Sequence, residues 1–198
     1  GNHDMTRMSF DLDDTQQRLG FAFILSMPGV PFIYYGDEIG MRYLPEITSV
    51  EGGYHRTGAR TPMQWDDSTN CGFSSAAPDK LYTPVDPSAD KPTVKAQLAD
   101  ESSLLNEVKR LIEVRKTTPA LQESAHFELL TKDGGYPLVY LRGTKEDGVL
   151  VAINPLDKAC TIRTEYTPTD TLYSIGDSAT TVDGVLTLPP CSASYLKL

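Results

Sequence analysis

The chain has 198 residues, enough for one sizeable domain or two small ones. Lys and Arg number 18 against 27 Asp and Glu, which gives a net charge of −9. This acidic balance argues against nucleic acid or an anionic membrane as a partner and suits a soluble protein with a neutral or cationic ligand. No apolar run approaches the ~18–20 residues that a membrane span needs.

The three cysteines, Cys71, Cys160 and Cys191, are an odd and widely spaced set. This spacing matches neither a disulfide framework nor a metal site, so we expect small buried thiols. The first residues lack the charged and apolar regions of a signal peptide. Because the chain is expected to begin within a longer protein, the lack of a signal peptide here does not determine the cellular compartment, although the cytoplasm is favoured.

The first predicted elements are a helix and a short strand. Acidic residues before an apolar block and Pro28-Gly29 after it predict a helix over residues 14–26. The apolar run at 30–35 carries β-branched and aromatic residues on both parities, which predicts a parallel strand buried on two faces. This order indicates one αβ step of an α/β fold.

Residues 40–100 show no convincing periodicity and are rich in Pro and Gly. A segment of this length without regular structure is usually functional or a linker. The linker interpretation is disfavoured because the segment holds too many aromatic residues for a solvated tether: Tyr43, Tyr54, Trp65, Phe73 and Tyr82.

An amphipathic helix is predicted near residues 102–117, where leucine, valine and isoleucine recur on one face. Asp100 is the expected N-cap, and Pro119 ends the run. Short strands separated by turns follow, which predicts an antiparallel sandwich and a domain boundary near residue 120. The expected strands are 126–131, 138–142, 149–154, 161–163, 171–174, 185–188 and 193–198, with one turn at Asp133-Gly134-Gly135.

Two acidic positions are candidates for chemistry. In the first, Asn2-His3-Asp4, the carboxylate and imidazole could bind vicinal hydroxyls or stabilise a developing cation, or they could simply cap the following helix. The second, Asp37-Glu38, directly follows the predicted buried strand. Parallel-strand ends are where α/β folds bind ligands, but acids there also cap turns.

Two further segments are candidates for a binding site. Within the segment 56–67, Arg60, Gln64 and Trp65 would suit a sugar site, with planar hydrogen bonding and an aromatic platform. The alternative is that Trp65 and Met63 anchor the loop to the core. Either phenol of Tyr34-Tyr35 could face a site, although at least one is expected to pack.

Four motifs occur in a fixed order: GNHD at 1–4, GVPFIYYGDEIGM at 29–41, RTPMQWD at 60–66 and SLLNEVKRLIEVRKTTPAL at 103–121. This ordered set resembles the C-terminal part of the α-amylase family, glycoside hydrolase family 13. Its motifs are most similar to the α-glucosidase and oligo-1,6-glucosidase branch. The resemblance implies an α+β fragment in two parts. Residues 1–121 would supply the last strands and helices of a (β/α)8 barrel, and residues 122–198 an all-β antiparallel sandwich domain.

The resemblance also implies roles for individual residues. Asp4 corresponds to the family's transition-state stabiliser, His3 to a ligand of the same sugar ring, and Arg60 to a substrate contact. The family's nucleophile and general acid lie on earlier strands, so the chain alone is expected to be inactive and to need the N-terminal barrel portion. No cofactor or metal is expected within these residues, and a calcium loop, where the family has one, would lie upstream.

Three functions stay open at this stage. The first is a part of a retaining α-glycoside hydrolase that acts on α-glucosidic bonds of oligosaccharides. The second is a part of a glucosyl-transferring relative such as a trehalose synthase. The third is a non-catalytic sugar-binding or stabilising module.

Overall fold

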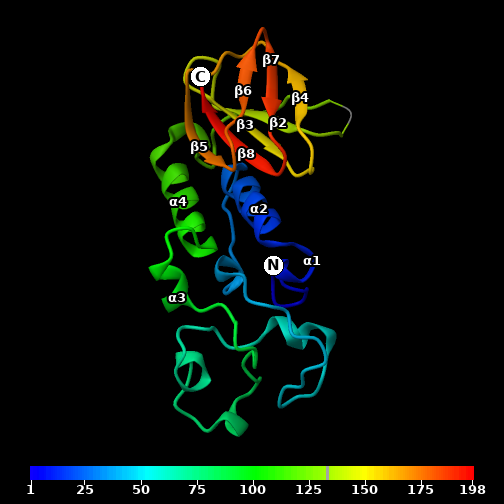
Figure 1. Ribbon diagram of the computed structural model, residues 1–198, viewed down its shortest axis with the longest axis vertical. Helices are drawn as coiled ribbons and strands as arrows, with labels where there is room; N and C mark the ends of the chain where they lie inside the picture. The colour runs from blue at the N-terminus through cyan, green and yellow to red at the C-terminus, as the bar shows by residue number, and fades with distance from the viewer. Residues whose placement is uncertain (133) are drawn as a thin grey trace. The chain divides into compact units, whose positions relative to one another are not determined.

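The computed structural model describes residues 1–132 and 134–198 (Figure 1), so Asp133 of the expected turn lies outside the described residues. The chain divides into two compact units. The first comprises Gly1–Gln17 and Phe32–Val108, and the second Arg18–Pro31 and Lys109–Leu198. Within the described chain, no helix combines the length and the apolar character that spanning a membrane requires.

Helix α1, Met8–Asp11, is short and was not predicted. Helix α2 spans Asp14–Ser26 and confirms the first predicted helix. A reciprocal cap starts α2: the backbone N–H of Gln16 donates to Oδ1 of Asp13 over 2.8 Å, and that of Asp13 donates to Oε1 of Gln16 over 3.0 Å. The cap satisfies backbone donors that the first helical turn leaves free. It explains why local sequence suffices to place this helix.

The prediction of a strand at residues 30–35 is wrong, because the structure has no strand there. The segment is instead unpaired, and Val30 and Phe32 are 73% and 86% exposed. A parallel strand exists only through hydrogen bonds to its neighbours. Every strand pair in the described residues is antiparallel and lies in the second half of the chain, so residues 30–35 have no partner.

Residues 40–100 are mostly irregular, as expected, with 3-10 turns at His55–Ala59, Thr69–Gly72 and Pro78–Lys80. The helix α3, Val94–Ala99, was not predicted, because six residues are too short to show a period. Thr93 caps it by accepting from the backbone N–H of Ala96 over 3.2 Å. Inside the first unit, Ile39, Met41 and Met63 form a buried cluster.

Helix α4, Leu104–Thr117, confirms the second predicted helix. Its N-cap is Ser103 and not Asp100, because Oγ of Ser103 accepts from the backbone N–H of Asn106 over 3.2 Å. Asp100 instead caps the C-terminus of α3. The short helix at 94–99, which the sequence does not reveal, accounts for this error.

Two antiparallel sheets form from residue 127 onward. The five-stranded sheet has the order β1-β2-β3-β8-β5 and the three-stranded sheet the order β4-β7-β6 (Figure 1). All seven predicted strands are confirmed within a few residues, and the three-residue β6 is additional. The strands are β1 Phe127–Leu129, β2 Leu138–Arg142, β3 Val149–Asn154, β4 Cys160–Arg163, β5 Asp170–Ile175, β6 Thr180–Val182, β7 Val185–Leu188 and β8 Ser192–Lys197.

Both sheets contribute to one buried apolar cluster. Leu141 and Leu150 are opposite each other across β2 and β3, and Leu150 in turn faces Leu196 of β8. From the smaller sheet, Leu186 and Leu188 of β7 are completely buried in the same cluster. Residues at alternate positions of each strand therefore face a shared core.

The end of α2 is attached to the five-stranded sheet by buried polar groups. The Ser26 hydroxyl donates to the Ala22 carbonyl over 2.6 Å, so its oxygen is left to accept from the Tyr140 hydroxyl at 2.5 Å. The Tyr195 hydroxyl also donates to the Ala22 carbonyl over 2.5 Å. Burial raises the pKa of Tyr140 to about 12, which keeps this phenol protonated and able to donate.

Candidate functional site

The three residues singled out from the sequence, His3, Asp4 and Arg60, lie together in the first unit. Nε of Arg60 donates to the His3 carbonyl over 2.8 Å, and Nη2 donates to Oδ1 of Asp4 over 3.1 Å. Nε2 of His3 lies 3.1 Å from the other carboxylate oxygen of Asp4. We call these residues, with Arg56, the Asp4 cluster.

Arg56 is the member of the cluster that sequence analysis missed. Its Nη1 lies 3.7 Å from Oδ1 of Asp4, so two guanidinium groups face one carboxylate oxygen. The signal was a second arginine four positions before Arg60, on the 3-10 turn His55–Ala59. The Asp4 side chain is 56% exposed, which leaves the carboxylate accessible from solvent.

Neither His3 nor Asp4 caps the next helix. The N-cap of α1 is Arg7, and it makes no side-chain cap hydrogen bond. The Asp4 backbone N–H donates to Oδ1 of Asn2 over 2.8 Å, so Asn2 shapes the turn while the Asp4 carboxylate faces the arginines. The helix-cap alternative is therefore excluded for Asp4.

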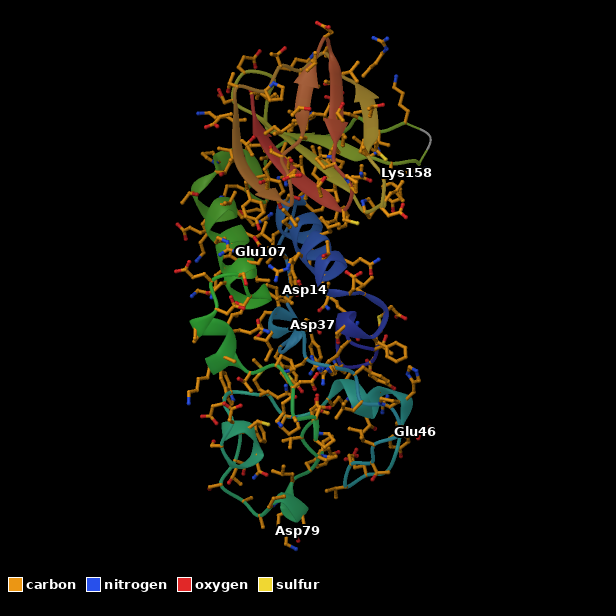
Figure 2. All side chains as sticks on the ribbon, viewed as in Figure 1. Asp14, Asp37, Glu46, Asp79, Glu107 and Lys158 are labelled. Carbon is orange, nitrogen blue, oxygen red and sulfur yellow. The ribbon has the colours of Figure 1, made fainter. Side chains whose placement is uncertain are left out.

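Asp37, the first acid after residues 30–35 and labelled in Figure 2, is buried, with 2% of its surface exposed. Nη1 of Arg7 lies 3.4 Å from Oδ1 of Asp37 and donates to the Tyr35 carbonyl over 2.7 Å. The same guanidinium lies about 5 Å from the ring centroids of Tyr34 and Tyr35. Asp37 and Arg7 are almost completely buried, which indicates a structural pair.

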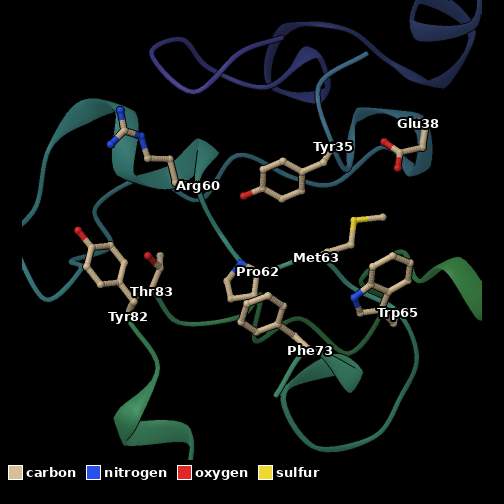
Figure 3. Close-up of a pocket in the computed structure, with 9 residues that line it drawn as sticks. All are labelled: Tyr35, Glu38, Arg60, Pro62, Met63, Trp65, Phe73, Tyr82 and Thr83. Atoms are coloured by element: carbon tan, nitrogen blue, oxygen red, sulfur yellow. The ribbon is translucent and has the colours of Figure 1, made fainter. Parts of the chain in front are cut away.

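A pocket of about 420 Å³ adjoins the Asp4 cluster and shares Arg60 with it. Figure 3 shows Tyr35 on one side and Phe73 opposite, with Glu38 and Trp65 toward one end and Arg60 and Tyr82 toward the other. The residues that line it include Tyr35, Glu38, Arg60, Trp65, Phe73 and Tyr82. Aromatic side chains thus surround a small number of polar groups, which is typical of a ligand site.

Glu38 is the acid that lines this pocket. Burial raises the pKa of its carboxyl above the usual range of a glutamate, and nearby Asp37 adds to the effect while Arg7 opposes it. Within the described chain its Oε2 is buried without a hydrogen-bond partner. A titratable group with a raised pKa in a pocket is a candidate for function.

The loop at 60–66 differs in part from expectation. Gln64 does not face the pocket: it is 1% exposed, and its Nε2 donates to the Pro92 carbonyl over 2.5 Å. Met63 anchors the loop in the buried cluster, as the alternative predicted. Trp65 does not share that role, because it is 49% exposed and lines the pocket.

The tyrosines at 34 and 35 attach this segment to the loop. The Tyr34 hydroxyl donates to the Ala59 carbonyl over 3.2 Å, and the Tyr35 hydroxyl donates to the Thr61 carbonyl over 2.8 Å. These bonds place Arg60 between two fixed backbone positions.

Among the described residues, no group of three or more His, Cys, Asp or Glu side chains is placed to hold a metal ion.

The accessible Asp4 carboxylate, held by two arginines, thus lies beside an aromatic-lined pocket with a few polar groups, as in many small-ligand sites. A family model described as "Alpha amylase, catalytic domain" matches residues 1–124. The chain therefore belongs to the α-amylase family, as the ordered motifs predicted.

Relatives with curated descriptions include a trehalose synthase/amylase and an oligo-1,6-glucosidase. The trehalose synthase/amylase TreS of Mycobacterium tuberculosis is 37% identical over 177 residues, which is 81% of this chain and 28% of that protein. The oligo-1,6-glucosidase of Parageobacillus thermoglucosidasius is 32% identical over 196 residues, which is 82% of this chain and 34% of that protein. The chain thus spans about a third of the length of these relatives.

Among solved structures, trehalulose synthase MutB from Pseudomonas mesoacidophila matches the whole chain with a TM-score of 0.82. The match covers 42% of that protein at 23% sequence identity. At this identity the likeness concerns the fold, and it supports the described combination of helices and antiparallel sheets as a part of that larger fold.

Proposed function

We propose that this chain supplies the substrate-stabilising carboxylate of an enzyme that acts on α-glucosidic bonds of oligosaccharides. The observation that carries the proposal is the arrangement around Asp4, which is accessible, held by Arg60 and Arg56, and not used as a helix cap. A carboxylate held in this way can accept hydrogen bonds from vicinal hydroxyls of a sugar ring.

The proposed role of Asp4 belongs to the transition state of a retaining reaction. In such a reaction one carboxylate attacks the anomeric carbon, and an acid about 5 Å away protonates the leaving oxygen. As the ring flattens and becomes cationic, Asp4 holds its hydroxyls and stabilises the developing positive charge. His3 contacts the same ring, and Arg60 orients the Asp4 carboxylate and contacts the substrate.

The nucleophile and the general acid are proposed to come from residues outside this chain. Asp37 is paired with Arg7 in the interior, so it is unsuited to either role. We assign residues 1–121 to the C-terminal part of a (β/α)8 barrel and residues 122–198 to an all-β sandwich domain. The exposure of Val30 and Phe32 supports this assignment, because neighbouring barrel strands would cover them.

A second candidate is transfer of the glucosyl unit to another hydroxyl in place of hydrolysis. The higher identity to a trehalose synthase/amylase, 37% against 32% for an oligo-1,6-glucosidase, favours it. Both reactions use the same carboxylates and differ in whether water reaches the intermediate. A non-catalytic role as a sugar-binding or stabilising module is the third candidate.

Turnover measurements test the proposal. The 198-residue chain should not cleave p-nitrophenyl α-glucoside, maltose, isomaltose or starch. A chimaeric enzyme, in which the chain replaces the matched segment of the Parageobacillus oligo-1,6-glucosidase, should cleave isomaltose. Activity of the chain alone that Asp4→Asn abolishes would show that the nucleophile and acid are within it, contrary to the proposal.

A further inference from the structure

The Arg60 side chain, which holds the Asp4 carboxylate, projects from a stretch of backbone that is buried on both sides. Ala59 and Thr61 are 0% and 1% exposed, whereas the Arg60 side chain is 35% exposed. A partly solvated arginine samples many rotamers, so its own side chain has no fixed direction. The guanidinium can therefore orient Asp4 only as well as the backbone on either side of Arg60 is held.

Two consecutive tyrosines hold this backbone, one on each side of Arg60. The Tyr34 hydroxyl donates to the Ala59 carbonyl over 3.2 Å. The Tyr35 hydroxyl donates to the Thr61 carbonyl over 2.8 Å, and Figure 3 shows it directed toward the segment that carries Arg60. Burial raises the pKa of Tyr34 to about 12, so this phenol stays protonated and able to donate near neutral pH. Both hydroxyl groups thus limit how far the backbone at Arg60 can move.

The tyrosine pair is itself fixed by Arg7, three positions after Asp4 in the chain. Nη1 of Arg7 donates to the Tyr35 carbonyl over 2.7 Å. The guanidinium carbon lies 5.1 Å from the ring centroid of Tyr34 and 5.0 Å from that of Tyr35. Arg7 is 1% exposed, and Gly36 packs so closely against it that a Cβ there would lie 2.9 Å from Nη1. The guanidinium is therefore confined and cannot follow a displaced tyrosine.

These contacts close a circuit through the candidate site. The circuit runs along the chain from Asp4 to Arg7, by hydrogen bonds through Tyr35 to the Thr61 carbonyl, and back from Arg60 to Asp4. The separation of Asp4 and Arg60 is therefore set by buried groups on the far side of the circuit, because their own attraction is screened by solvent. We propose that Tyr35, with Tyr34 beside it, is a positioning residue that holds the Arg60 guanidinium against Asp4 during the reaction.

The kinetic consequence rests on the proposed function, because it assigns the tyrosine hydroxyls to the step in which Asp4 acts. A shift of about 1 Å in a group that orients the reacting atoms can cost up to about 10²-fold in rate. In the chimaeric enzyme, Tyr35→Phe should lower kcat/KM for isomaltose about tenfold, chiefly through kcat. Tyr34→Phe should lower it less, because its hydrogen bond is the longer of the two.

A double-mutant cycle separates positioning from a general loss of stability. If Tyr35 acts through Arg60, Tyr35→Phe should change kcat/KM by less than about twofold once Arg60→Met is present, because coupled residues are not additive. The control is Tyr140→Phe, which removes the buried hydrogen bond to Ser26 in the second unit. Its melting temperature should fall at least as far as that of Tyr35→Phe, while its kcat/KM should stay within about twofold in either background.

A crystal structure of the Tyr35→Phe chimaera tests the geometry without reference to catalysis. Nη2 of Arg60, which lies 3.1 Å from Oδ1 of Asp4 in the unmodified chain, should move beyond about 3.5 Å or occupy more than one conformer. If Tyr35→Phe does not fold, Tyr34→Phe carries the same cycle and the same structure determination, because its hydroxyl holds the other side of Arg60.

Three results would overturn the inference. The first is an unchanged contact between Arg60 and Asp4 in the crystal structure. The second is a tenfold effect of Tyr35→Phe that persists in Arg60→Met, which would show that Tyr35 does not act through Arg60. The third is an equal loss of kcat/KM in Tyr140→Phe, which would show that activity follows stability. If Asp4→Asn leaves turnover unchanged, the proposed function fails, while a displaced Arg60 guanidinium would still support positioning by Tyr35.

Discussion

Oδ1 of Asp4 lies 3.1 Å from Nη2 of Arg60, although 56 positions separate the two residues in the chain. The same guanidinium donates from Nε to the carbonyl of His3, so Arg60 fixes both the backbone and the carboxylate of one turn. The Asp4 and Arg60 side chains are 56% and 35% exposed, so solvent screens their attraction. The pair therefore orients the carboxylate more than it stabilises the fold.

Arg60→Met should separate these two effects. The free energy of unfolding should change by less than about 1 kcal/mol, because exposed ion pairs contribute little. In the chimaeric enzyme, kcat/KM should fall by about 10²-fold, because the carboxylate loses its orientation. Urea denaturation and steady-state kinetics measure the two quantities.

Lys145→Met is the matched control, since it removes another exposed ion pair, with Glu165 at 2.6 Å in the second unit. It should leave kcat/KM unchanged. An unfolding free energy that falls by several kcal/mol in Arg60→Met, with kcat intact, would identify Arg60 as a structural residue.

Two tyrosines of the second unit, Tyr140 and Tyr173, have buried hydroxyl groups and should respond differently to the loss of these groups. Tyr140→Phe removes the donor to Ser26 Oγ and should lower the free energy of unfolding by about 1–2 kcal/mol. The Tyr173 hydroxyl is buried without a partner in the described chain, so Tyr173→Phe should be neutral or stabilising. Urea denaturation of both variants tests the contrast, and equal losses would contradict the assigned network.

Stability should depend on the ionisation of Glu38. Because burial raises the pKa of this carboxyl, the folded chain binds its proton more tightly than the unfolded chain does. The free energy of unfolding should therefore decrease as the pH rises from the pKa of the unfolded state to that of the folded state, and then stay lower. Glu38→Gln should abolish this decrease.

Melting temperatures measured from acid to neutral pH provide the test. The difference between Glu38→Gln and the unmodified chain should grow in favour of the variant as pH rises through this window. Glu46→Gln, an exposed acid, should show no such growth. A difference that shrinks with rising pH would mean that the ionised carboxylate is stabilised in the fold.

The sequence predicts those features that nearby residues determine. The helix at 14–26 carries its own cap in Asp13 and Gln16, and turn residues separate the short apolar runs that form the strands of the second half of the chain. The segment 30–35 has the composition of a buried strand, but strand formation depends on partners that are distant in sequence. Its apolar pattern alone could not reveal that no strand among the described residues pairs with it.

The same distinction applies to the site. Motif order singled out Asp4, His3 and Arg60, and the structure places these three residues together, while the roles assigned to them are proposals. Gln64 was misjudged because its partner, the Pro92 carbonyl, is 28 positions away. Arg56 was missed because its contact with Asp4 depends on how the 3-10 turn His55–Ala59 folds back.

The central claim, that Asp4 acts on the transition state, is tested most directly by Asp4→Asn in the chimaeric enzyme. The variant should lower kcat/KM for isomaltose by ~10³-fold or more, about 4 kcal/mol, while KM changes far less. Its melting temperature should hardly move, because the carboxylate is accessible and caps no helix. Asp11→Asn, an exposed acid of the same unit, should leave both quantities unchanged. A nearly normal kcat with a lowered melting temperature would contradict the account.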